Sequence, residues 1–191
     1  MLAALINTAL AATGAVALAA YAVCARLQTF VFTPQIGITQ GIQPIVGYNA
    51  GRRLTGRVNR TLTLATRATA IYGAITAALI ALLAQPLLGL FISDPATTAV
   101  TVGALRIIAI GFVFAGIPPL ISAYFQSLGR ATPSYLISIG TLVLIKAPLV
   151  LALGTRGPTG IWISLPIGEA ISVVAAVGLL WRFGRPRTLT A

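Results

Sequence analysis

Histidine is absent from this 191-residue sequence, and cysteine occurs only once, as Cys24. The chain therefore lacks the commonest general base and zinc ligand, and it cannot close an intramolecular disulfide. Carboxylates are nearly as scarce, because Asp94 and Glu169 are the only two. These groups are too few for a hydrolytic or metal-dependent active site, so we expect no enzyme, no bound metal and no cofactor. We expect Cys24 to serve as a small apolar side chain in a core.

Charge of either sign is sparse. Only 8% of the residues are charged, 58% are hydrophobic, and the mean hydropathy is +0.97. A soluble globular domain has about 25% charged residues, so this chain cannot cover its surface with polar groups. The composition predicts an all-α integral membrane protein whose main partner is the lipid bilayer.

Six apolar blocks follow one another along the chain. A bilayer core takes about 20 helical residues, so the first block, 1–13, is a truncated helix that is too short to span it. Transmembrane helices are predicted at 15–50, 60–92, 97–128, 132–153 and 159–182, followed by a tail at 183–191. Together they form one membrane domain, 1–191. Because prolines inside spanning helices need neighbouring helices or water to satisfy the freed carbonyls, we expect a bundle packed around a cavity.

Basic residues are concentrated in alternate loops. They are Arg52, Arg53, Arg57 and Arg60 after the second block, Arg130 after the fourth, and Arg182, Arg185 and Arg187 in the tail. The loop at 93–95 has none, and the loop before the last block has only Arg156. The positive-inside rule therefore predicts a cytoplasmic C-terminus. It also accounts for the net charge of +11, so we expect no nucleic-acid partner.

The longest predicted helix carries more amides than a helix in lipid needs. Four polar residues starting at Gln28 recur at spacings of seven, four and four, which places them along one face. The stretch 37–53, GITQGIQPIVGYNAGRR, adds further polar side chains. The candidate cavity-lining residues are Gln28, Gln35, Thr39, Gln40, Gln43, Tyr48 and Asn49. They line a water-filled path or hold neighbouring helices together, and the sequence leaves both interpretations open.

Two Gly-x-x-x-Gly pairs occur in the same helix, Gly37 with Gly41 and Gly47 with Gly51. Such pairs allow helix backbones to approach closely. We therefore predict a seam of small residues that packs against a neighbouring helix.

Glu169 lies in the middle of the last apolar block, in LPIGEAIS. An ionisable group there is costly unless it is paired or wetted, so it marks a candidate functional site. It can take up a proton, or it can pair with Lys146, which lies inside another apolar block. The sequence does not decide between these roles. Asp94 precedes Pro95 at the start of a predicted helix, where an N-cap is expected.

The stretch GITQGIQPIVGYNAGRR resembles the signature at the start of the C-terminal half of MATE (multidrug and toxic compound extrusion) transporters, most of all in the branch of MepA and DinF. AYAVCARLQTFVFTP precedes it, and GALRIIAIGFVFAGI, AYFQSLGRATPSY and GIWISLPIGEAIS follow in the order of that family. The resemblance covers the chain from about residue 5 onward.

The resemblance implies a bundle of about five complete transmembrane helices after a truncated one, corresponding to the second of two six-helix lobes. An N-terminal lobe is then missing or separately encoded. Because Met1 falls inside an apolar block, we expect a truncated gene, a split transporter or a misassigned start. The function implied is half of a secondary active antiporter in the bacterial cytoplasmic membrane. It exports drugs, organic cations and amphipathic compounds in exchange for protons or sodium ions. Some relatives have a carboxylate cation site in this lobe that the present chain lacks. Ion coupling through acidic groups then comes either from the missing N-terminal lobe or from Glu169, which is the ion-coupling candidate in this chain.

Two alternatives remain. One is a flippase of the wider superfamily that moves lipid-linked sugars, although its members usually lack QPIVGYNAG. The other is a membrane fragment that transports nothing. The upstream DNA distinguishes a transporter from a fragment. Six further apolar helices in the same reading frame, or an adjacent gene for a matching lobe, indicate a transporter, and the absence of both indicates a fragment.

Overall fold

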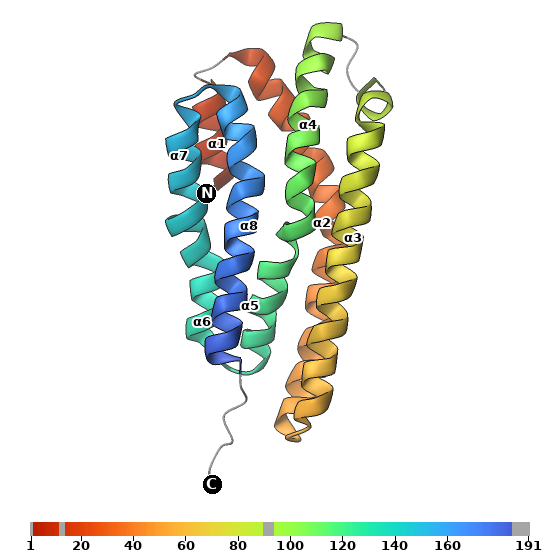
Figure 1. Ribbon diagram of the computed structural model, residues 1–191, viewed down its shortest axis with the longest axis vertical. Coiled ribbons are helices and arrows are strands. Elements are labelled where there is room, and N and C mark those ends of the chain that lie inside the picture. Colours follow the sequence, from red (N-terminus) through yellow and green to blue (C-terminus); the bar gives the residue numbers. More distant parts are fainter. Residues whose placement is uncertain (1, 12–13, 90–93, 185–191) are drawn as a thin grey trace.

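The computed structural model describes residues 2–11, 14–89 and 94–184, and every element in these ranges is helical (Figure 1). The elements are α1 (Leu2–Ala11), α2 (Ala15–Gly51), α3 (Thr55–Gly89), α4 (Pro95–Ala115), α5 (Ile117–Ser127), α6 (Ala131–Tyr135), the π-helices η1 (Leu136–Gly140) and η2 (Leu142–Lys146), α7 (Ala147–Gly154) and α8 (Pro158–Phe183). The tail predicted at 183–191 lies almost wholly outside the described residues.

Five helical segments are long and apolar enough to cross a membrane. They are Ala15–Gly51, Thr55–Gly89, Thr97–Ser127, Ala131–Gly154 and Pro158–Phe183. The predicted all-α membrane bundle is thus confirmed. The helix predicted at 60–92 begins five residues earlier, at Thr55, so its first turns include Arg57 and Arg60. The short α1 has 10 residues.

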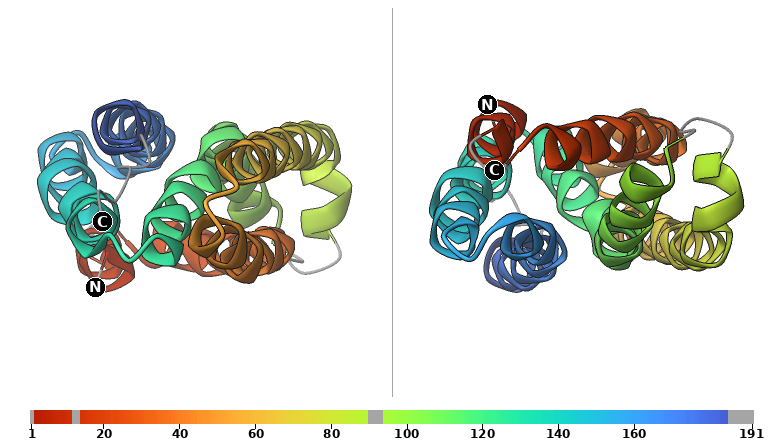
Figure 2. Two further views of the ribbon diagram at one scale, coloured as in Figure 1. Left: turned by 90° about the horizontal axis from the view of Figure 1, so that it is seen from below. Right: turned by 90° about the horizontal axis from the view of Figure 1, so that it is seen from above.

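The helices form two groups joined through α4 and α5. In Figures 1 and 2, α2 and α3 lie on one side of the bundle, and α1, α7 and α8 lie on the other. Helix α4 packs against α2, α3 and α8, which makes it the central helix of the bundle.

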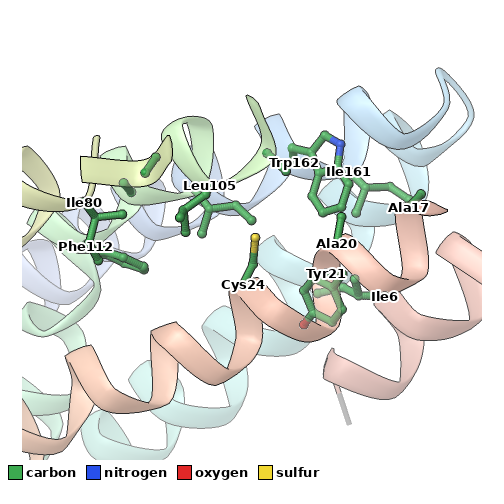
Figure 3. Close-up of a cluster of buried hydrophobic side chains, with 14 of the residues drawn as sticks. Ile6, Ala17, Ala20, Tyr21, Cys24, Ile80, Leu105, Phe112, Ile161 and Trp162 are labelled. Atoms are coloured by element: carbon green, nitrogen blue, oxygen red, sulfur yellow. The ribbon is translucent and has the colours of Figure 1, made fainter. Parts of the chain in front are cut away.

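Two clusters of apolar side chains hold the bundle together. The larger one joins α1, α2, α3, α4, α7 and α8, and it includes Leu105, Phe112 and Trp162 (Figure 3). Cys24 is 1% exposed, and its sulfur points into this cluster, as expected for a small apolar side chain. The second cluster surrounds Tyr124 and joins α2, α3, α5 and α8.

The helix predicted at 97–128 is in fact two helices. Helix α4 ends at Ala115, and α5 begins at Ile117 on the other side of Gly116. The cause is the pair Pro118 and Pro119, because prolines have no N–H to donate to the carbonyls four residues earlier. The break lies inside the span, next to the cavity described below.

The two π-helices were not predicted. They occupy most of Leu136–Lys146 and continue into α7. In a π-helix each bond closes over five residues, so the side chains are rotated relative to an α-helical register. This rotation sets the direction in which Lys146, the last residue of η2, leaves the backbone.

Among the described residues, no helix packs closely against the predicted glycine seam on α2. A Cβ added at Gly37, Gly41 or Gly51 would meet nothing within 4 Å. At Gly47 it would make an ordinary contact, 3.6 Å from the carbonyl oxygen of Ser127. The spacing permits a close approach, but no helix in the described chain makes one there.

Asp94 caps α4 as predicted, since its Oδ2 accepts a hydrogen bond of 2.8 Å from the backbone N–H of Thr97. We expect Asp94→Ala to lower the free energy of unfolding by about 1 kcal/mol, because the freed N–H at the helix start loses its acceptor. Denaturant unfolding of the chain in detergent micelles measures this. Asp94→Asn keeps an acceptor and should retain most of the stability, and equal losses in both variants would argue against capping.

Candidate functional site

A cavity of about 590 Å³ opens beside the break between α4 and α5. Its wall is formed by α2, by the break, by the segment 137–146 and by α8. The lining residues are Phe32, Gln35, Ile36, Thr39, Gln40 and Gln43 of α2, Ala115, Pro118 and Pro119 at the break, Ile137, Ser138, Thr141 and Lys146 of the segment 137–146, and Glu169 of α8. Its wall thus combines amides and hydroxyls with apolar and aromatic surface and one pair of opposite charges. Such a lining suits an amphipathic ligand.

Four of the seven predicted cavity residues line this cavity together, namely Gln35, Thr39, Gln40 and Gln43. Gln35, Thr39 and Gln43 follow one another at spacings of four, which brings them to one face, and Gln40 lies beside Thr39 and three residues before Gln43. Gln28 lies nearer the N-terminus of α2 and lines a second, smaller cavity of about 170 Å³.

Tyr48 and Asn49 line neither of these cavities. Tyr48 is 63% exposed, and its hydroxyl accepts a hydrogen bond of 2.9 Å from Nη1 of Arg52. Asn49 is buried, and its side-chain amide donates to the carbonyl of Ile45 at 2.8 Å. Both residues lie beyond Gln43 towards the end of α2, outside the reach of the cavity. Within the described chain they do not line this cavity, and their role as substrate-lining residues stays a prediction.

Lys146 and Glu169 form an ion pair between η2 and α8, with 2.6 Å between Nζ and Oε1. Their side chains are 21% and 17% exposed. The lysine stem runs along Gly168, where an added Cβ would come within 3.3 Å of the Cγ of Lys146. The pairing that the sequence left open is therefore present.

Glu169 borders both cavities. It lines the larger one together with Lys146 and the smaller one together with Gln28 and Tyr21. One carboxylate oxygen bonds to Lys146, while Oε2 has no hydrogen-bond partner among the described residues. A carboxylate in this position can accept a proton or bind a cation from either cavity.

Sequence reasoning missed a cluster of hydroxyls at the wall of the larger cavity. The Oγ of Ser122 lies 2.8 Å from the Oγ of Ser134 and 2.8 Å from the Oγ of Ser138, and Gln126 donates to Ser134 at 3.0 Å. The cluster joins α5, α6 and η1. No sequence signal could have found it, because single serines are common in membrane helices and their proximity depends on helix packing.

Known proteins resemble this chain along most of its length. The MatE family model matches residues 1–151. The multidrug export protein MepA of Staphylococcus saprophyticus is 25% identical over 176 residues, which are 92% of this chain and 39% of MepA. The chain thus spans about two fifths of the length of that relative.

Solved structures share the fold. The MATE multidrug transporter DinF-BH is similar with a TM-score of 0.79 and 30% identity, over 87% of this chain and 37% of that one. A variant of the MATE transporter VcmN of Vibrio cholerae has a TM-score of 0.91 at 22% identity, over 96% of this chain and 42% of VcmN. Because the family model covers most of the sequence, the chain belongs to the MatE family.

Proposed function

We propose that this chain forms the C-terminal lobe of a secondary active antiporter that exports drugs and organic cations in exchange for protons or sodium ions. The observation that carries the proposal is the cavity in which amides of α2 face the Lys146–Glu169 pair. The similarity to MepA and the share of MepA that the chain spans support a half-transporter that works with an N-terminal lobe, missing or separately encoded. The arginines of the loops support an orientation with the C-terminus in the cytoplasm, and the relatives in bacteria such as Staphylococcus saprophyticus support a bacterial cytoplasmic membrane.

The ion pair explains why proton uptake would favour release of an organic cation rather than its binding. While Lys146 and Glu169 are both charged, the pair adds no net charge to the cavity, and the amides and apolar wall can hold an organic cation. When a proton neutralises Glu169, the ammonium of Lys146 is left without its counter-charge. The cavity becomes positive, and a bound cation is repelled. Uptake of one proton thereby favours release of one cation, which is the coupling that antiport requires.

The test measures equilibrium binding of ethidium to the purified 191-residue chain in detergent micelles, by ethidium fluorescence. We expect Glu169→Gln to raise the dissociation constant about tenfold or more, equivalent to about 1.4 kcal/mol, because Lys146 then repels the dye. Asp94→Asn is the matched control, since it neutralises the other carboxylate, which lies outside the cavity.

Equal affinities of these two variants would contradict the role of Glu169. The chain alone is not expected to export ethidium from cells or vesicles, because alternating access needs a second lobe that rocks against the first. Efflux from vesicles that contain only this chain would therefore contradict the proposal of a half-transporter.

A further inference from the structure

Another cavity, of about 410 Å³, opens at the end of the bundle where α8 ends (Figure 1). Its walls include Asn59 and Thr63 of α3, Tyr124 of α5, and Trp181 and Gly184 at the end of α8. The hydroxyl of Tyr124 donates to the carbonyl of Gly184 at 3.3 Å, which ties α5 to the end of α8. These residues define a groove between α3 and α8, which we call the α3–α8 groove. None of the five lines the larger cavity.

One ridge of α3 leads out of this groove. Asn59, Thr63, Arg67, Ile71 and Ile75 follow one another at spacings of four, and all five side chains are exposed. Along this ridge the side chains change from polar to basic and then to apolar. Long side chains of a helix lean towards its N-terminus, so Arg67 covers the turn of Thr63 at the edge of the groove. The ridge therefore offers polar and positive groups at one end and apolar surface at the other, which matches the headgroup and the acyl chains of a phospholipid.

The end of α8 places the groove at the depth of lipid headgroups. The spanning helix ends at Phe183, and Trp181 in its last turn is 80% exposed. Tryptophan is enriched where a transmembrane helix reaches the membrane surface, because its ring is apolar and its N–H is polar. Further from this end, Val174 is 73% exposed and Ile171 is 43% exposed, so the same helix presents apolar surface to acyl chains.

The charge at this end of the bundle is positive. Arg182 lies in the last turn of α8, and Arg130 donates from Nη1 to the carbonyl of Phe183. The sequence has only two side-chain carboxylates, and neither offsets these arginines. Asp94 precedes α4, which begins at the opposite end of the bundle (Figure 1), and Glu169 lies in the ion pair at the larger cavity. Basic pockets between transmembrane helices on the cytoplasmic side of a membrane bind anionic lipid headgroups.

The groove lies across the bundle from α2. Figure 2, which looks along the bundle, places α3 and α8 at one edge and α1 and α2 at the opposite edge. Since the polar wall of the larger cavity belongs to α2, a second lobe that shares this cavity leaves the α3–α8 groove open to lipid. The tail of the chain is a poor occupant, because residues 185–191 include Arg185 and Arg187 and have no acidic side chain. The arginines at the groove therefore favour an anionic lipid from the bilayer.

We propose that an anionic phospholipid binds in the α3–α8 groove. Arg67 and Arg182 bind its phosphate, Asn59 donates a hydrogen bond from its side-chain amide, and the acyl chains lie along the apolar part of the ridge and of α8. Guanidinium groups suit this ligand, because their fork of N–H groups matches the oxygens of a phosphate. The apolar continuation of the ridge favours a lipid over a free phosphate. The site shares no residue with the cavity of the proposed function and does not depend on it.

The test is native mass spectrometry of the purified full chain in a neutral detergent, titrated with phosphatidylglycerol or with phosphatidylcholine of the same acyl chains. We expect the dissociation constant for phosphatidylglycerol to be lower by about tenfold or more, because the arginines attract its net negative charge.

Arg67→Gln should reduce this preference about fivefold, the usual contribution of one arginine near an anionic lipid surface. Arg67→Lys keeps the positive charge and should retain more of the preference than Arg67→Gln does. Arg156→Gln is the matched control, because Arg156 is an exposed arginine between α7 and α8, at the opposite end of the bundle (Figure 1). It should leave the preference unchanged.

A competition arm separates a lipid from a soluble anion. Glycerol 1-phosphate carries the phosphate without acyl chains, and it should not displace phosphatidylglycerol at the same concentration. Displacement would assign the groove to a soluble anion and overturn the proposal. Equal affinities for the two lipids, or equal effects of Arg67→Gln and Arg156→Gln, would overturn it as well.

Discussion

Lys146→Met and Glu169→Gln are each expected to lower the free energy of unfolding by about 2 kcal/mol, whereas the double variant should lose much less than the sum. Breaking a buried ion pair by removing one partner costs about 3–5 kcal/mol, because a charge is left without compensation, and removing both partners is often nearly neutral. We expect a smaller loss, about 2 kcal/mol, because both side chains line a cavity and are about one fifth exposed, so that water can partly compensate the remaining charge. Denaturant unfolding of the four proteins in detergent micelles completes the double-mutant cycle.

The control cycle combines Lys146→Met with Asp94→Asn. Asp94 caps α4 and is not the partner of Lys146, so these two changes should be additive within about 0.5 kcal/mol. A charge swap, Lys146→Glu with Glu169→Lys, should recover part of the stability that either single reversal loses. Additive losses in both the neutral and the swapped double variants would mean that the pair contributes no coupling.

Gly73→Ala is expected to destabilise the chain by about 3 kcal/mol, the upper end of the usual cost of overpacking. Gly73 lies on α3 where this helix crosses α4, and an added Cβ would collide with the carbonyl of Phe112 and come within 3.2 Å of Cα of Val113. These atoms belong to the backbone, so no side-chain rotation relieves the clash. The two helices must separate, and contacts of the larger apolar cluster are lost along their length.

Gly103→Ala is the matched substitution. Gly103 lies on α4, and a Cβ there would meet nothing within 4 Å. The variant should be as stable as the original chain or more stable by about 0.5–1 kcal/mol, because alanine loses less backbone freedom than glycine in a helix. Thermal unfolding in detergent compares the two directly. Similar melting temperatures for Gly73→Ala and Gly103→Ala would show that α3 and α4 do not need the close approach.

The predicted polar face of α2 shows how far helical periodicity carries. It brought Gln35, Thr39 and Gln43 to one cavity, because residues three or four apart share a face in any helix. It does not fix which cavity a residue reaches, since Gln28 on the same face lines the smaller cavity instead. The position of a cavity along a helix depends on the neighbouring helices. The same limit applies to the glycine pairs of α2, whose spacing permits a close contact but does not supply the partner.

The membrane class and the number of spans could be predicted from the amino-acid sequence, because the length of an apolar helix is set directly by the thickness of the bilayer. It also supplied the candidates Glu169 and Lys146, since a charge inside an apolar block is visible without a structure. That these two residues, 23 positions apart, meet at 2.6 Å depends on how the helices pack and is visible in the folded structure alone. Helix packing likewise brings Gln35 of α2 and Thr69 of α3 against Gly116 at the break between α4 and α5. The physical reason is that contacts between helices depend on their rotation and crossing, and the breaks and π-turns that set these are stabilised by packing rather than by local residue preference.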